Sequence, residues 1–203
     1  MKLLHLDSSI LGDASVSRQL TREVVEAFRL AESQLEVSYR DLVADVDGHL
    51  SGAVLAAKGT PAELRTPEQS RLADKAQAVM AEFLASDVIV IGAPMYNFSI
   101  PSQLKAWIDL ISVAGVTFRY GANGPEGMVH GKRAVIVATA GGKHAGTPGS
   151  AAHIDYLRFL LGFLGIADVS VIAAEGLNMG PAVRDTSLDA ARNAIGTLAE
   201  TTI

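Results

Sequence analysis

The run from Met95 to Phe98 combines side chains that suit a flat heteroaromatic ligand. Met95, Tyr96 and Phe98 supply a thioether and two aromatic rings, which pack well against a planar ring. Asn97 supplies an amide that can hydrogen-bond the edge of that ring. The alternative is a loop whose apolar residues only cap the hydrophobic core, and the four residues alone do not decide between the two.

Hydroxyl groups gather in a second stretch, Ser8 to Ser17, which contains four serines and one glycine. Ser15 and Ser17 stand where a helical pattern begins. Hydroxyls and backbone N–H groups at such a helix start suit a phosphate monoester, because they converge on the positive end of the helix dipole. Arg18 adds a charge nearby. The alternative role of Ser15 is the helix N-cap, which is compatible with phosphate binding.

A third stretch, Thr139 to His144, contains two adjacent glycines. Gly141 and Gly142 carry no Cβ, so the backbone there can come close to a flat ligand. The alternative is a plain turn.

Each of the three stretches follows an apolar run of strand type. The run Val88 to Ile91 is uncharged and β-branched, which is typical of a strand buried on both faces of a parallel sheet. Gly92 and Pro94 are expected to end that strand, and Pro101 to open a helix. Four further strands are expected at Lys2–Asp7, Leu35–Asp41, Arg133–Ala140 and Asp168–Ala174.

Apolar residues at helical spacing separate the strands. Helices are expected after Ser17, before Asp87, after Pro101, at Ile154–Leu164 and across Leu188–Leu198, with a short helix near Ser51–Lys58 inside the weakly patterned segment Leu42–Pro67. Thr147 and Pro148 are expected to cap and start the helix at 154–164, and Phe118 and Tyr120 to belong to a short extended or hairpin excursion.

This alternation predicts the α/β class, with one domain over residues 1–203 built on a doubly wound five-stranded parallel sheet. Such sheets bind ligands beyond the carboxyl ends of the strands, where the strand order reverses. In the order 2-1-3-4-5, the loops after the first, third and fourth strands meet there. These loops are the three stretches described above.

The three loops together favour a mononucleotide with a planar ring. The first loop lacks the three glycines of a dinucleotide fingerprint, and Gly127 to Arg133 lacks the spacing and the hydroxyl of a P-loop. A phosphate site, an aromatic and amide loop and a glycine platform fit flavin mononucleotide (FMN) best. No metal site is expected.

The same residues resemble the FMN-dependent NADH:quinone oxidoreductases, also called FMN-dependent azoreductases, whose fold is flavodoxin-like. The resemblance covers nearly the whole chain. It rests on Ser8–Ser9, Ser15–Arg18, Ala93–Pro101, Gly115–Tyr120, Gly124–Gly127, Gly141–Gly142, Phe163–Gly165 and Glu175–Gly176.

The resemblance implies one FMN per subunit and a set of contacts to it. The implied contacts are Ser9, Ser15, Val16 and Ser17 around the phosphate, Met95, Tyr96, Asn97 and Phe98 at the ring, and Thr139, Ala140, Gly141 and Gly142 beside it. Some members have serine and a more polar neighbour at Thr139–Ala140, so the side-chain contacts there are in question while the backbone contacts are not.

The resemblance also implies the reaction. NADH or NADPH would reduce the flavin and leave, and a quinone or azo compound would enter the same place, in a ping-pong cycle that requires no catalytic side chain. Asn97 is expected to hydrogen-bond the ring edge. Tyr120 and His144 are expected to shape the substrate pocket or supply a proton, although a loop histidine such as His144 can also be merely solvated. A homodimer with the flavin near the subunit boundary would explain the apolar helix at 154–164.

Composition narrows the class of protein. The net charge of −5 and pI near 5.5 argue against nucleic acid or a membrane surface as the main partner, and the absence of cysteine excludes disulfides and thiol chemistry. The start Met1–Asp7 is too short for a secretory signal, so a cytoplasmic protein is expected. Two rivals stay open, namely a one-electron carrier, whose acidic docking face the modest charge disfavours, and a regulatory domain without a cofactor.

Overall fold

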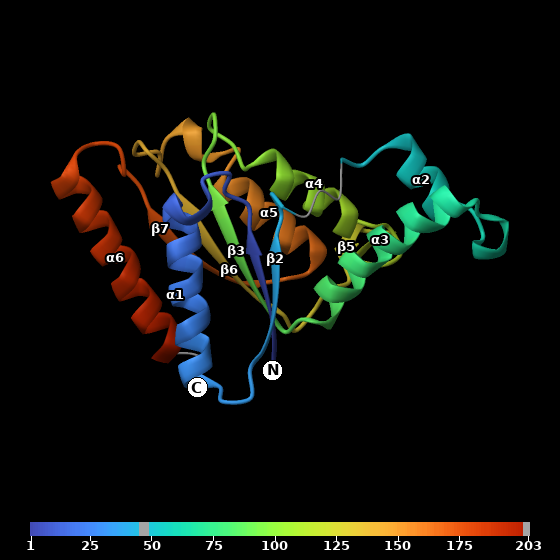
Figure 1. The fold of residues 1–203 in the computed structure, drawn as a ribbon, viewed down its shortest axis with the longest axis horizontal. Helices are drawn as coiled ribbons and strands as arrows, with labels where there is room; N and C mark the ends of the chain where they lie inside the picture. The colour runs from blue at the N-terminus through green and yellow to red at the C-terminus, as the bar shows by residue number, and fades with distance from the viewer. Residues whose placement is uncertain (45–48, 201–203) are drawn as a thin grey trace.

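A computed structural model describes residues 1–44 and 49–200, so residues 45–48 and 201–203 of the expected domain lie outside the described residues. Its centre is a five-stranded parallel sheet in the order β2-β1-β3-β6-β7, which confirms the predicted order (Figure 1). The strands are β1 (Lys2–Asp7), β2 (Glu36–Asp41), β3 (Val88–Pro94), β6 (Arg133–Thr139) and β7 (Asp168–Ala174).

Helices cover both faces of this sheet (Figure 1). One face carries α1 (Val16–Ala31) and α6 (Pro181–Glu200), and the other carries α3 (Pro67–Ala85), α4 (Ser102–Ile111) and α5 (Ile154–Leu164). A short helix, α2 (Gly52–Gly59), packs against α3. Short 3₁₀ turns lie at η1 (Gly12–Ala14), η2 (Ala62–Leu64) and η3 (Pro148–Ser150).

The core has two layers because successive strand residues point to opposite faces. In β3, Val88 and Val90 pack under α1 and α6, whereas Ile89 and Ile91 pack under α3, α4 and α5. Every residue of β3 is buried, as its unbroken apolar run predicts for a central strand. β3 therefore contributes to both layers of the core at once.

An antiparallel hairpin lies outside the main sheet, as the sequence predicts. Its strands are β4 (Phe118–Gly121) and β5 (Gly124–Gly127), and β5 packs against α5. The ring of Phe118 lies 4.8 Å from that of Phe163 on α5, centroid to centroid.

The expected end of β3 was confirmed, and one expected helix start was wrong. β3 ends at Pro94, which pairs with Thr139 of β6. The pairing of β3 with β1 stops at Gly92, so an N–H at Pro94 would have no neighbouring strand to bind, and proline is tolerated there. Thr147 and Pro148 start only the turn η3, and α5 begins at Ile154.

Among the described residues, no helix is both long enough and apolar enough to cross a bilayer. The cytoplasmic location stays a prediction.

Candidate functional site

The loops after β1, β3 and β6 meet at the carboxyl edge of the sheet, as the strand order requires. A cavity of about 420 Å³ lies between them, a size in the range of small-molecule sites. Its walls are Ser9, Leu11, Ala14, Ser15, Val16, Pro94, Met95, Tyr96, Thr139, Ala140, Gly141, Leu177, Asn178 and Arg184.

The first wall is the start of α1. Ser15 is the N-cap, as the sequence allows, and its Oγ accepts a hydrogen bond from the N–H of Arg18 at 3.3 Å. The same Oγ lies 3.0 Å from the hydroxyl of Ser17, and both serines are buried. The N–H groups of Val16 and Ser17 belong to the first turn, where a helix offers them no carbonyl partner. Neutral donors therefore converge at the positive end of α1, which suits an anionic phosphate.

The second wall is a tight turn after β3. The N–H of Tyr96 donates to the carbonyl of Ser99 at 2.9 Å, and the reverse bond measures 3.1 Å. Between them Asn97 and Phe98 have φ values of 50° and 66°. The left-handed region is unusual for a residue as large as phenylalanine and costs of order 1 kcal/mol or more. Backbone strain of this kind is concentrated at functional sites, where the loop conformation itself is required.

The Tyr96 hydroxyl joins this turn to the first wall. It lies 3.1 Å from Ser9 Oγ and accepts a hydrogen bond from the N–H of Ile10 at 3.2 Å. The two loops are separated by more than 80 residues in the chain, so no local pattern could have shown this link. The loop after β1 and the turn after β3 therefore share one hydrogen-bonded frame.

The third wall is the loop after β6, which the segment after β7 holds in place. Glu175 accepts hydrogen bonds from the N–H groups of His144 and Ala145, both at 3.1 Å. The N–H of Asn178 donates to the carbonyl of Gly141 at 3.0 Å. The ring of His144 packs edge to face against Phe98, with centroids 5.6 Å apart. His144 thus borders the tight turn, which is compatible with a place at the substrate pocket.

A buried histidine ties the end of β3 to the start of α5. His153 Nε2 lies 2.8 Å from the carbonyl oxygen of Ala93, the residue before Pro94. Burial lowers the pKa of His153, and the hydrogen bond to Ala93 and the charge of Glu175 only partly oppose that shift. The ring is therefore neutral near pH 7 and donates to the Ala93 carbonyl, which fixes the base of the tight turn.

Replacing His153 with glutamine is expected to make stability less dependent on pH. The folded pKa of His153 lies below its usual value of 6.5, so its contribution is complete above pH 6.5 and is lost as the pH falls through the folded pKa. One such group changes the free energy of unfolding by at most about 1.4 kcal/mol per pH unit. Urea unfolding of both proteins between pH 7.5 and 5 should show a shallower loss for the variant, whose amide still donates but does not titrate. Parallel curves would contradict this role.

The structure brings most of the predicted contacts together. Ser9, Ser15, Val16, Met95, Tyr96, Thr139, Ala140 and Gly141 line the cavity. Ser17, Asn97, Phe98 and Gly142 lie in the same loops but not among the lining residues. Tyr120 is elsewhere within this chain, on β4 with its ring against Phe118, so a role in the pocket would need a second subunit. The contacts of all these residues to FMN stay predictions.

Six lining residues were missed by sequence reasoning. They are Leu11, Ala14, Pro94, Leu177, Asn178 and Arg184. The last three follow β7, and no motif marks them. The only available signal is the sheet topology, which places the loop after β7 next to the loop after β6.

A larger cavity, of about 590 Å³, lies at the opposite end of the sheet and includes Asp87, His130 and Lys132. Doubly wound sheets bind their ligands at the carboxyl ends of the strands, and the strained turn and the helix start are at that end. We therefore assign the functional site to the smaller cavity.

Comparison with known proteins shows the family to which the chain belongs. A family model described as the flavodoxin-like fold matches residues 1–198. The chain is 58% identical over 195 residues to FMN-dependent NADH:quinone oxidoreductase 2 of Pseudomonas aeruginosa, covering 96% of each chain. It is 55% identical over 192 residues to FMN-dependent NADH:quinone oxidoreductase 1 of Pseudomonas putida, covering 95% of each.

Solved structures agree on the fold. An azoreductase from Bacillus anthracis superposes with a TM-score of 0.88 at 23% identity, over 99% of both chains. An FMN-dependent NADH-azoreductase from Bacillus anthracis, solved in complex with FMN, superposes with a TM-score of 0.86 at 24% identity, over 98% of this chain and 100% of the other. The chain therefore belongs to the flavodoxin-like family of FMN-dependent NADH:quinone oxidoreductases.

Proposed function

We propose that this chain is a single-domain FMN-dependent oxidoreductase that transfers two electrons from NADH or NADPH to quinones and reductively cleaves aromatic azo compounds. The observation that carries the proposal is the cavity lined by Ser15 at the start of α1, by Met95 and Tyr96 of the tight turn, and by Gly141 after β6. The names of its relatives support the same activity. When bound, FMN supplies the hydride and electron transfer chemistry, and the protein binds and orients the reactants.

The residues present fit FMN at both of its ends. Ser15, Ser17 and the first N–H groups of α1 offer hydrogen bonds to a phosphate without a competing carboxylate among the residues that line the cavity. At the other end Gly141 lines the cavity without a Cβ of its own, and we propose that its backbone faces the flat ring. We propose that Met95 and Tyr96 flank the ring and that the Asn97 amide bonds its edge, where charge develops on reduction.

An exposed group of aromatic side chains supports a homodimer. Phe159 on α5 is 72% exposed and Tyr120 on β4 is 77% exposed, and both belong to one chain of ring contacts through Phe118 and Phe163. Large exposed aromatic surfaces of this kind mark interaction sites. We propose that a second copy covers this aromatic group and brings Tyr120 near the cavity of its partner, where donor and acceptor bind in turn.

The visible spectrum of the purified protein tests the proposed function. We expect flavin bands, FMN on release by denaturation, and bleaching when NADH is added without oxygen. Recovery of the colour on adding a quinone would complete the cycle. A protein that stays colourless after incubation with FMN would refute the proposal and favour a regulatory domain. Bound FMN that NADH does not bleach would favour a one-electron carrier.

A further inference from the structure

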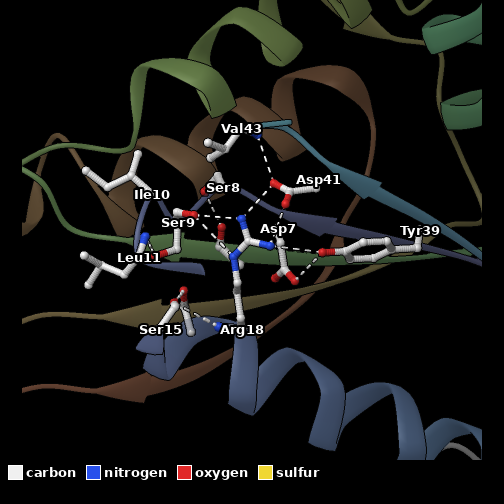
Figure 2. A network of polar contacts seen from close by, with 12 residues as sticks. Asp7, Ser8, Ser9, Ile10, Leu11, Ser15, Arg18, Tyr39, Asp41 and Val43 are labelled. Carbon is white, nitrogen blue, oxygen red and sulfur yellow. Dashed lines mark hydrogen bonds and ion pairs between the residues drawn. The ribbon is translucent and has the colours of Figure 1, made fainter. Parts of the chain in front are cut away.

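Arg18 lies beneath the first loop with its guanidinium buried and fully occupied (Figure 2). Its Nη1 and Nη2 donate to the two oxygens of Asp41, each at 2.7 Å. Its Nε and Nη2 donate to the backbone carbonyl of Ser9, at 3.2 and 2.8 Å. Nη1 also donates to the Tyr39 hydroxyl at 3.1 Å. Such a planar fork serves two acceptors at once, which an ammonium group cannot do.

The sequence suggests that Arg18 places a positive charge beside the phosphate. In the structure its side chain is instead directed toward Asp41 and the Ser9 carbonyl. Arg18 does not line the cavity, and its charge is matched by Asp41 at the end of β2. Burial alone would raise the pKa of Asp41, but the hydrogen bonds from Arg18 and from the Val43 N–H hold that pKa below its usual range. The pair is thus ionised on both sides at neutral pH, and little net charge is left for a ligand.

The guanidinium of Arg18 instead determines how the peptide group of Ser9 is oriented. Its carbonyl oxygen is held toward Arg18 by the two hydrogen bonds from Nε and Nη2 (Figure 2). The Ser9 hydroxyl then meets the Tyr96 hydroxyl and accepts from the N–H of Leu11 at 3.3 Å. If the fork were absent, the Ser9 carbonyl could rotate toward the cavity, where its negative end would repel an anion but not a neutral ligand.

We propose that Arg18 is a positioning residue that makes this cavity prefer a phosphorylated flavin over an unphosphorylated one, by holding the Ser9 carbonyl out of the phosphate site. Asp41 pairs with the guanidinium of Arg18 and fixes its position. A residue of β2 that does not line the cavity therefore contributes to the choice of ligand. The inference rests on the proposed function, because it takes FMN as the ligand.

The test compares FMN with riboflavin, which differs only in lacking the phosphate. Apoprotein of the wild type, Arg18→Gln and Arg18→Lys is titrated with each flavin, and the dissociation constants are read from flavin fluorescence. We expect both variants to lose roughly tenfold or more in FMN affinity, with riboflavin affinity changed less than about threefold. Lysine keeps the charge but not the fork, so it should not restore FMN binding.

Arg22→Gln is the matched control. Arg22 lies one turn further along α1, its side chain is 54% exposed, and within the described part of the chain it makes a long ion pair with Asp13 at 4.0 Å. This control should leave both affinities unchanged. Asp41→Asn should cause the same selective loss of FMN affinity, because it weakens the pairing with the Arg18 guanidinium without removing Arg18. This variant provides the test if the Arg18 variants do not fold.

The outcomes separate the two proposals. Equal losses for FMN and riboflavin would mean that Arg18 acts only on general stability, and full recovery by Arg18→Lys would mean that charge rather than the fork matters. Unchanged affinities would also overturn the inference. A wild type that binds neither flavin would refute the proposed function itself.

Discussion

Valine in place of Gly141 is expected to lower FMN affinity by about 100-fold while the domain stays folded. A Cβ at this position would lie 2.5 Å from Nδ2 of Asn178, and both residues line the cavity. Asn178 is exposed, so its side chain can swing aside and the fold can absorb the change. The space beside the glycine is then filled by branched methyl groups, and a flat ring can no longer approach the backbone.

Titration of apoprotein with FMN, together with thermal unfolding of the apoprotein, measures both halves of this expectation. Gly196→Ala on α6 is the control, because nothing lies within 4 Å of its added Cβ. That variant should bind FMN as the wild type does. Unimpaired FMN binding by Gly141→Val would show that the loop after β6 is not part of the flavin site.

Alanine at Gly127 is expected to have the largest effect on stability, a loss of about 3 kcal/mol or more in the free energy of unfolding. The added Cβ would lie 2.3 Å from the backbone nitrogen of Gly165 and 2.4 Å from the carbonyl carbon of Leu164. These are backbone atoms at the end of α5, which cannot turn aside as a side chain can. The hairpin of β4 and β5 must therefore move away from α5, or the end of α5 must unwind.

Urea unfolding measures the loss, and the quinone reductase rate of the surviving folded protein measures its consequence for the hairpin. Gly121→Ala, in the same hairpin, is the matched control, since the nearest atom to its Cβ is a carbonyl oxygen at 3.6 Å. It should lose little stability. Similar stability of Gly127→Ala and Gly121→Ala would contradict the close contact between β5 and α5.

The sequence was a good guide wherever structure follows from a repeating local pattern. The unbroken apolar run of Val88 to Ile91 predicted a central strand, and β3 is buried throughout. The hydroxyl at Ser15 before a helical pattern predicted an N-cap, and it is one. The start of α5 was predicted wrongly, because Thr147 and Pro148 cap only the turn η3 and α5 begins at Ile154.

The candidate site, too, could be predicted from the sequence only in part. Its position followed from the alternation of strands and helices, since strand order alone decides which loops meet at the carboxyl edge. By contrast, the direction of the Arg18 side chain on α1 depends on Asp41, 23 residues away on β2, and the Tyr96 hydroxyl meets Ser9 across 87 residues. Asn178 joins the cavity only because β7 lies beside β6.

By itself, the sequence determined the α/β class, the strands and helices, and the three loops that line the cavity, because period, propensity and turn chemistry act over a few residues. Only the tertiary structure decided which polar groups in those loops line the cavity and which hold the loops in place. That choice depends on contacts between segments that are far apart in the sequence, such as those of Arg18 with Asp41 and of Tyr96 with Ser9.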